Sequence, residues 1–232
     1  HFLDALQCLQ AGLDRPQQQP LGILRRDALI GQADIDDGDG DVGLGAGVGV
    51  ATLTRSEGLL LLPGLLCDGR LWRDQVAALE SIAAIQVPDL TLDDSVTAMA
   101  TRVLAAAPPR FALAGLSMGG YVAFEILRQA PERVTRLALL DTSARQDEPK
   151  RAAVRRAGLA LAERGRFAGV TNKLLPQLIH ESRVGLPVGE DVMAMAARVG
   201  REAFIRQQRA ILERSDSLPL LPTIDQPTLI AV

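Results

Sequence analysis

The chain has 232 residues, 47% of them hydrophobic and 23% charged, and its formal net charge at pH 7 is −3. This composition is typical of a globular domain and excludes a disordered chain. It gives no electrostatic reason to expect nucleic acid or an anionic membrane as a partner, and no apolar run approaches the roughly 20 residues that span a bilayer. We therefore expect a soluble protein that binds a small molecule, with its oligomeric state left open.

The two cysteines, Cys8 and Cys67, are too few for a disulfide framework and lack the spacing of metal ligands. Free thiols are typical of a reducing compartment, so the cytoplasm is the expected location. The first residue is not Met, and the segment after it has no basic n-region, which argues against a signal peptide.

Residues 1–56 differ in character from the rest of the chain. They contain an Asp/Gly run at 34–41 and a glycine at every second position over 43–49. Such glycine-rich sequence loses much entropy on ordering and has few side chains to bury, so we expect irregular structure that is not certain to be native to the fold. The run at 34–41 lacks the glycine and glutamate positions of a calcium loop, and 43–49 does not fit a dinucleotide motif. We expect neither a metal nor an organic cofactor.

From residue 57 onward, short apolar runs alternate with longer amphipathic segments, which indicates βα units on a parallel sheet. The expected strands are residues 59–62, 85–87, 111–116, 134–140 and 227–232. Three helices are expected. The first is 69–79, the second is capped by Asp94 or Ser95 and ends at Pro108, and the third is 121–130. The fold class predicted is α/β, with a doubly wound, mostly parallel sheet.

Residues 144–218, which we call the cap segment, have helical patterns and no convincing strand. The sequence therefore divides into an irregular part (1–56), a core (57–143), the cap segment, and the start of a C-terminal part of the core (219–232). A basic cluster near the start of the cap segment is expected to be a solvated helix face; it consists of Lys150, Arg151, Arg155 and Arg156.

The strongest motif is Gly115-Leu116-Ser117-Met118-Gly119, a G-x-S-x-G between a predicted strand and a predicted helix. Its glycines remove Cβ atoms where strand and helix approach closely, which permits a sharp turn that exposes the serine hydroxyl. Ser117 is the candidate nucleophile. The N–H of Met118, at the start of the helix, is the candidate donor to a tetrahedral oxyanion, and a second candidate is the N–H of Leu65 in the turn after the first strand.

From Gly58 onward the chain resembles bacterial α/β-hydrolases of the esterase, lipase and cofactor-free haloperoxidase kind. Three segments carry the resemblance: residues 60–68 (LLLPGLLCD), 115–125 (GLSMGGYVAFE) and 133–145 (RVTRLALLDTSAR). The resemblance implies that Ser117 forms an acyl-enzyme, that Met118 and Leu65 supply the oxyanion N–H groups, and that the cap segment shapes the acyl pocket. Where many members have His-Gly at the turn after the first strand, this chain has Pro-Gly.

In this family the nucleophile is followed along the chain by an Asp or Glu and then by a His. The acid is expected in the loop after strand 227–232, where the sequence ends, so we interpret the chain as C-terminally truncated, without the last strand, helix and histidine loop. Of the two histidines, neither His1 nor His180 is expected to act as the base. Asp141, after strand 134–140, is expected to form a turn with Thr142 and Ser143.

The function predicted is hydrolysis of carboxylic esters, with thioesters, lactones and amides left open because they use the same groups. Acyl transfer and perhydrolysis through the same serine are alternatives within the fold. The alternative from another class is a non-catalytic binding protein, since removing the histidine from such a site costs on the order of a million-fold in turnover. On this interpretation the isolated chain has an open sheet edge and poor solubility.

Overall fold

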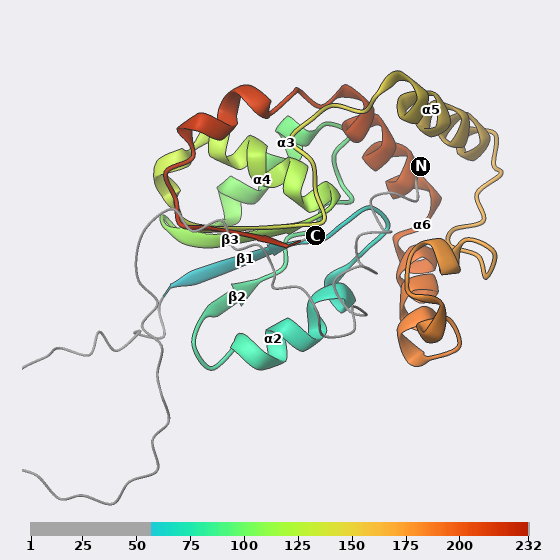
Figure 1. The fold of residues 1–232 in the computed structure, drawn as a ribbon, viewed down its shortest axis with the longest axis horizontal. Coiled ribbons are helices and arrows are strands. Elements are labelled where there is room, and N and C mark those ends of the chain that lie inside the picture. The colour runs from blue at the N-terminus through green and yellow to red at the C-terminus, as the bar shows by residue number, and fades with distance from the viewer. Residues whose placement is uncertain (1–56, 232) are drawn as a thin grey trace, which may run out of the picture.

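The computed structural model describes residues 57–231 (Figure 1). The expectations for residues 1–56, including the acidic and glycine-rich runs, lie outside the described residues. No helix in the described range combines the length and apolarity needed to cross a membrane.

Five strands form one sheet in the order β2-β1-β3-β4-β5, and every neighbouring pair is parallel. The strands are β1 (Gly58–Leu62), β2 (Ala84–Gln86), β3 (Phe111–Leu116), β4 (Val134–Leu140) and β5 (Thr228–Ala231). The chain proceeds outward from β1 to β2, then returns to place β3 on the other side of β1. The strand order therefore reverses between β1 and β3, and ligands of open α/β sheets bind beyond the carboxyl ends of the strands at such a point.

Helices cover both faces of the sheet. They are α2 (Arg73–Leu79), α3 (Val96–Ala106) and α4 (Met118–Gln129). In Figure 1, α2 lies on the opposite side of the strands from α3 and α4. The pleat of β1 explains this division, because Leu60 and Leu62 join the larger core while Leu61 packs with Trp72 in a smaller one. The predicted doubly wound α/β class is confirmed.

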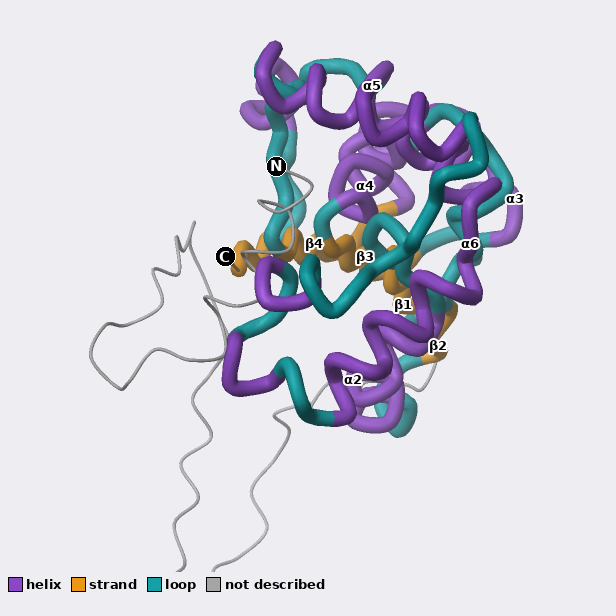
Figure 2. The backbone as a smooth tube through the Cα atoms, turned by 90° about the vertical axis from the view of Figure 1, so that its right-hand side faces the viewer, coloured by secondary structure: helices purple, strands orange, loops and turns teal. Residues whose placement is uncertain are grey.

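The cap segment forms two long helices and several 3₁₀ turns, as its periodicity predicted. The helices are α5 (Pro149–Glu163) and α6 (Pro187–Glu213), and the turns inside the segment are Leu175–Gln177 and Glu181–Arg183. A third turn, Leu218–Thr223, begins at its last residue and continues into the C-terminal part of the core. Gly200 interrupts the helical dihedrals of α6 with φ 75°. Figure 2 shows α6 running between the levels of α3 and α2, so this helix spans the carboxyl end of the sheet. Its role as a cap stays a prediction.

Two predicted helices differ in their boundaries. The expected helix 69–79 begins as a 3₁₀ turn (Gly69–Trp72) because the Asp68 side chain accepts the Arg70 N–H at its start. The helix expected from residue 121 begins at Met118, because Gly119 and Gly120 are helical despite their low propensity. For α3, Ser95 rather than Asp94 is the N-cap, accepting the N–H of Ala98 at 3.1 Å.

Arg133, in the turn Pro131–Arg133 before β4, joins the end of α3 to the sheet. Its guanidinium donates to the carbonyl oxygens of Leu104, Ala107 and Pro108 at 2.8–3.0 Å and lies 5.6 Å from the centre of the Phe111 ring. Lysine cannot reproduce this planar set of donors.

We expect Arg133→Lys to lower the free energy of unfolding by about 1–3 kcal/mol, because carbonyls at the end of α3 lose a charged donor. Urea denaturation followed by circular dichroism measures the change. The control is Arg136→Lys, whose exposed ion pair with Glu57 predicts a change within about 0.5 kcal/mol. Equal effects of the two substitutions would contradict this account of Arg133.

Candidate functional site

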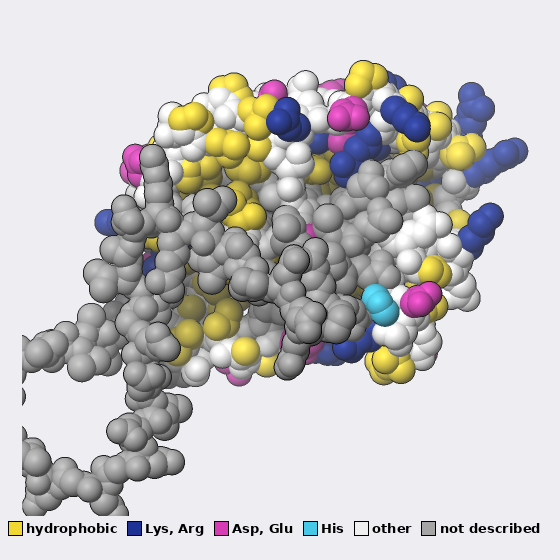
Figure 3. All heavy atoms as spheres, viewed as in Figure 1, with side chains coloured by type: hydrophobic (Ala, Val, Ile, Leu, Met, Phe, Trp, Pro, Cys, Tyr) yellow, Lys and Arg dark blue, Asp and Glu magenta, His cyan; other side chains and the backbone are white. Residues whose placement is uncertain are grey.

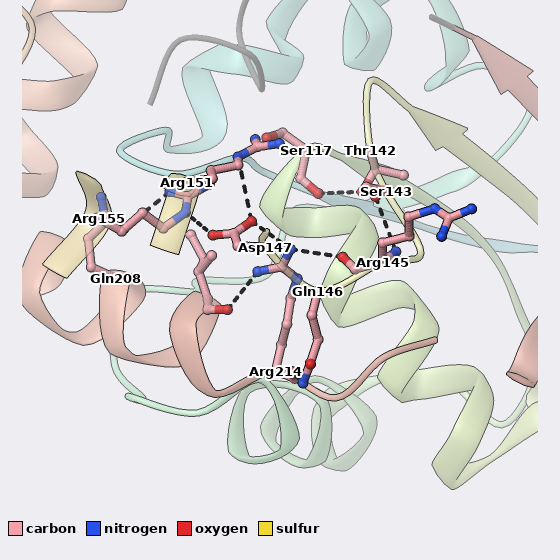
Figure 4. A network of polar contacts seen from close by, with 11 residues as sticks. Ser117, Thr142, Ser143, Arg145, Gln146, Asp147, Arg151, Arg155, Gln208 and Arg214 are labelled. Atoms are coloured by element: carbon pink, nitrogen blue, oxygen red, sulfur yellow. Dashed lines mark hydrogen bonds and ion pairs between the residues drawn. The ribbon is translucent and has the colours of Figure 1, made fainter. Parts of the chain in front are cut away.

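Ser117 lies between β3 and α4 in a left-handed backbone conformation, with φ 52° and ψ −111°. Such dihedrals are unfavourable for a non-glycine residue and persist only where the surroundings hold them. Here the Ser117 N–H donates to Leu140 at 2.9 Å, and the Ser117 carbonyl accepts from the Gly120 N–H at 2.9 Å and from the Thr142 hydroxyl at 2.8 Å (Figure 4). Main-chain and side-chain hydrogen bonds thus fix the strained turn.

Three glycines around Ser117 have no room for a side chain. A Cβ at Gly115 would lie 2.5 Å from the Gly119 carbonyl oxygen, and a Cβ at Gly119 would lie 2.3 Å from the Leu62 carbonyl oxygen. The sequence indicated these two positions. It did not single out Gly120, where a Cβ would lie 2.3 Å from the Thr142 hydroxyl. The only signal for the third position was a second glycine directly after the motif.

The candidate oxyanion donors come from the two strands on either side of the order reversal. Met118 begins α4 directly after Ser117, and Leu65 lies in the turn that follows β1, whose Leu62 is in register with Gly115 of β3. At Gly64, beside Leu65, a Cβ would lie 3.6 Å from the Leu116 carbonyl oxygen, so this turn packs against the residue that precedes Ser117. Within residues 57–231, neither the Met118 N–H nor the Leu65 N–H donates a hydrogen bond. Among the described residues, therefore, neither candidate donor is already used.

Cys67 is a buried free thiol in the same turn. Burial, together with the negative charge of Asp68, raises the pKa of Cys67 to about 12. A thiol with that pKa stays protonated at neutral pH and is a poor nucleophile. This favours a structural role for Cys67, and it leaves Ser117 as the nucleophile candidate of the site.

A cluster of charges that the sequence did not predict lies between the loop after β4 and the two cap helices. The side chain of Asp147 is 3% exposed and pairs with Arg155 at 2.5 Å, with Arg214 at 2.8 Å and with Arg151 at 3.5 Å. Figure 4 shows Asp147 between the three guanidinium groups. Burial raises the pKa of Asp147, but the hydrogen bonds and charges of Arg214 and Arg155 outweigh burial, so the net direction is downward.

The prediction of a solvated basic face on α5 is therefore wrong for Arg155, which is 3% exposed, and incomplete for Arg151, which is partly buried. Lys150 and Arg156 are exposed as expected, and Figure 3 shows Lys and Arg side chains projecting at the end of the molecule where α5 lies. The physical reason is the single carboxylate of Asp147, which lies before the helix at i−4 from Arg151 and i−8 from Arg155. The spacing of Arg151 and Arg155 from Asp147 is the sequence signal that could have indicated their burial.

Arg214 connects this cluster to α4, the helix that follows Ser117. Its guanidinium lies 4.2 Å from the centre of the Tyr121 ring in α4, and it also donates to the carbonyl oxygens of Arg145 and Ile211. A desolvated guanidinium over an aromatic face is a favourable cation–π contact. The end of α6 is therefore held against the helix that begins beside Ser117.

The remaining candidates have local roles in the structure. The His180 ring nitrogen Nδ1 accepts the Ser182 N–H at 3.2 Å and lies 2.9 Å from the Ser182 hydroxyl, so His180 caps the turn Glu181–Arg183. Asp141 ends β4 with φ 44°, and its N–H donates to Ala231 of β5 at 2.9 Å. Residues 57–231 contain no group of three or more His, Cys, Asp or Glu side chains suited to a metal ion.

The fold and the turn at Ser117 define the class, because a parallel α/β sheet with a serine on a sharp strand-to-helix turn is the arrangement of an α/β-hydrolase. An esterase from Thermogutta terrifontis, solved with malate bound, has 30% sequence identity and a TM-score of 0.63, and the match covers 75% of this chain and 70% of that one. The chain belongs to the α/β-hydrolase family. No family model matches it.

Two other proteins are similar to this chain, one in sequence and one in fold. Pimeloyl-[acyl-carrier protein] methyl ester esterase of Vibrio campbellii is 28% identical over 169 residues, which is 69% of this chain. The chain spans 62% of the length of that curated relative. The enol-lactonase from Burkholderia xenovorans has 22% identity and a TM-score of 0.65, covering 75% of this chain and 72% of that one, and this likeness concerns the fold alone.

We expect Asp147→Asn to lower the free energy of unfolding at pH 7 by about 3–5 kcal/mol, because it leaves buried guanidinium groups without their carboxylate. The folded-state pKa of Asp147 lies below the ordinary 3.8. The stabilisation is therefore complete above that pH and is lost as the pH falls through the lower folded value. Urea titrations of both proteins from pH 7 to pH 2 measure the difference. Asp74→Asn, which removes an exposed pair with Arg73, is the control. A difference that stays constant down to pH 2 would contradict this assignment.

The Cys67 thiol should not react with iodoacetamide in the folded protein at pH 8, because its raised pKa leaves almost no thiolate and its side chain is buried. A Cys8→Ser background makes the signal specific to this thiol. Mass spectrometry should detect labelling only after unfolding in urea, and rapid labelling of the native protein would show that the turn after β1 opens.

Proposed function

We propose that the protein hydrolyses carboxylic esters through an acyl-enzyme formed on Ser117. The observation that carries the proposal is the left-handed conformation of Ser117 at the point where the strand order reverses. A nucleophile on a strand-to-helix turn requires a strained backbone that its surroundings hold in place. At Ser117, three hydrogen bonds and three glycines with no room for a side chain hold it. A structural serine would have no need of these dihedrals.

In the proposed reaction the Ser117 hydroxyl oxygen attacks the acyl carbon, and its proton passes to a histidine acting as general base. The Met118 and Leu65 N–H groups receive the oxyanion, a stabilisation worth about 100- to 1000-fold in turnover for one donor. The protonated histidine gives its proton to the leaving alcohol. A water molecule, activated by the same base, then attacks the acyl group and releases the acid and Ser117.

We propose that the general base is a histidine other than His180. The ring of His180 is engaged with Ser182 in the turn Glu181–Arg183, where it has a local structural role. A base must lie within hydrogen-bond reach of the nucleophile, and Nδ1 of His180 is directed instead to the N–H and the hydroxyl of Ser182.

The names of two similar proteins support an ester bond as the target, since both are esterases. We propose a small-to-medium acyl group, bound between the carboxyl end of the sheet and the cap segment. The apolar side chains that the cap segment adds to the larger core, such as Leu175, Phe204 and Ile205, support an apolar acyl group rather than a charged one.

The test is p-nitrophenyl butyrate hydrolysis by the 232-residue chain and by the product of its reading frame expressed to the natural stop codon. We expect Ser117→Ala to lower turnover of the active form on the order of a million-fold, by analogy with serine proteases. Ser143→Ala, which removes a hydroxyl in a nearby loop, is the matched control and should retain activity, as should His180→Ala.

The outcomes separate the alternatives. Activity that survives Ser117→Ala would overturn the proposal. Activity that is abolished by His180→Ala would overturn our assignment of the base alone. Adding an alcohol or hydrogen peroxide distinguishes hydrolysis from acyl transfer and perhydrolysis, because the products are then an ester or a peracid instead of the free acid.

A further inference from the structure

A wholly buried glutamine of α6 contacts the turn that carries the second oxyanion donor. Gln207 has no exposed surface. Its side-chain oxygen Oε1 accepts the Leu66 N–H at 3.1 Å, and its Nε2 donates to the Leu90 carbonyl at 3.2 Å. The amide thus has a hydrogen-bond partner on each side, one in the turn after β1 and one in the loop after β2. A buried amide that bonds to two segments fixes their positions relative to each other.

The turn needs such support because of its own geometry. The Cys67 N–H donates to the Gly64 carbonyl at 3.1 Å, which closes a β-turn with Leu65 and Leu66 as the central residues. Leu66 has φ 59°, whereas Leu65 is not in the left-handed region. A positive φ at the third position is the signature of a type II turn, which favours glycine or asparagine there. Leucine is disfavoured at that position, so the turn does not hold this form by itself.

The hydrogen bond from Gln207 acts on the peptide that distinguishes the two common turn forms. Types I and II differ by a rotation of the central peptide, here the one between Leu65 and Leu66. Accepting the Leu66 N–H fixes the direction of that peptide and so keeps Leu66 left-handed. The Leu65 N–H belongs to the preceding peptide, which has the same orientation in both turn forms. Because the Gln207 amide also bonds Leu90, it holds the turn as a whole, and with it the Leu65 N–H, beside the residues that precede Ser117.

Two ion pairs connect α6 to the chain just beyond this turn. Asp68 pairs with Arg198 at 2.8 Å, and Arg70 pairs with Asp191 at 2.9 Å. Both pairs are partly exposed, so each contributes little to stability. Together with Gln207 they show that α6 is attached to the same segment at three points, of which Gln207 is the buried one and touches the turn itself.

We propose that Gln207 is a positioning residue for the Leu65 oxyanion donor. The proposal rests on the proposed function of Ser117 and Leu65. An oxyanion donor works only when its N–H is held at hydrogen-bond distance from where the negative charge develops. Removing the Gln207 amide frees the turn from α6 and from the loop after β2, so the Leu65 N–H is held less closely in place. Because the donor acts on the transition state more than on the bound ester, kcat should fall by about 10- to 100-fold with little change in KM.

The experiment compares Gln207→Met with Gln208→Met in the form of the protein that hydrolyses p-nitrophenyl butyrate. Gln208 is the next residue of the same helix, is 2% exposed, and accepts from Arg155 at 3.2 Å, away from the turn. Both variants lose one buried amide, so both should be less stable to urea. Only Gln207→Met should lose kcat, and only it should speed hydrogen exchange of the Leu66 amide, measured by NMR.

A second variant keeps the proposal testable if Gln207→Met does not fold. In Gln207→Glu the introduced carboxyl group is buried, and burial favours its neutral form. Its carbonyl oxygen then accepts from Leu66 and its hydroxyl donates to Leu90, so kcat should recover to within a few-fold of the original. Recovery would support the proposal, and a loss of kcat equal to that of Gln207→Met would oppose it.

The failure of this inference is distinguishable from the failure of the proposed function. Activity that survives Ser117→Ala would refute the function. If Ser117 is essential but Gln207→Met and Gln208→Met lose kcat equally, or neither loses it, Gln207 is structural only and the inference is wrong. Unchanged exchange of the Leu66 amide in Gln207→Met would overturn it independently of activity.

Discussion

The close approach of α4 to the two central strands is the constraint on which the rest of the site depends. At Gly119 the helix backbone lies so near the end of β1 that a Cβ would come within 2.3 Å of the Leu62 carbonyl oxygen. The chain leaving β3 must therefore turn sharply to enter the helix, and the residue at the corner takes up the strain. That residue is Ser117, with φ 52°. The same proximity brings the turn after β1 alongside the turn after β3, so one steric condition places both candidate oxyanion donors.

The cap segment reaches this region from two directions through buried polar contacts. On one side, Gln207 accepts from Leu66. On the other, Arg214 lies against Tyr121 and shares Asp147 with Arg155. The two buried guanidinium groups have more N–H donors than one carboxylate can accept. Remaining donors bond to Gln208 and to main-chain carbonyls. Compared with an apolar core of the same shape, a buried polar network contributes little net stability, but it specifies one arrangement of the parts it joins.

The sequence predicted the core elements well and the polar contacts poorly. Strands 111–116 and 134–140 have the predicted bounds because they lie inside the sheet, are mostly apolar and are flanked by turn residues. The motif around Ser117 was recognisable because its glycines report a local steric condition. Arg155 and Gln207 were not recognisable, since a charged or amide residue on a helix looks solvated until the chain that meets it is known. Leu66 gave no signal either, because leucine is not a residue that indicates a left-handed turn.

Helix geometry explains how α6 can serve two sites at once. Successive residues of an α-helix point in directions about 100° apart, so neighbouring side chains reach different surroundings. Gln207 is directed to the turn after β1, and Gln208 to Arg155 of α5. Because α6 is a single rigid element over this turn, a shift that breaks one contact strains the other. The position of α6 is therefore fixed jointly by the charge cluster around Asp147 and by the turn beside Ser117.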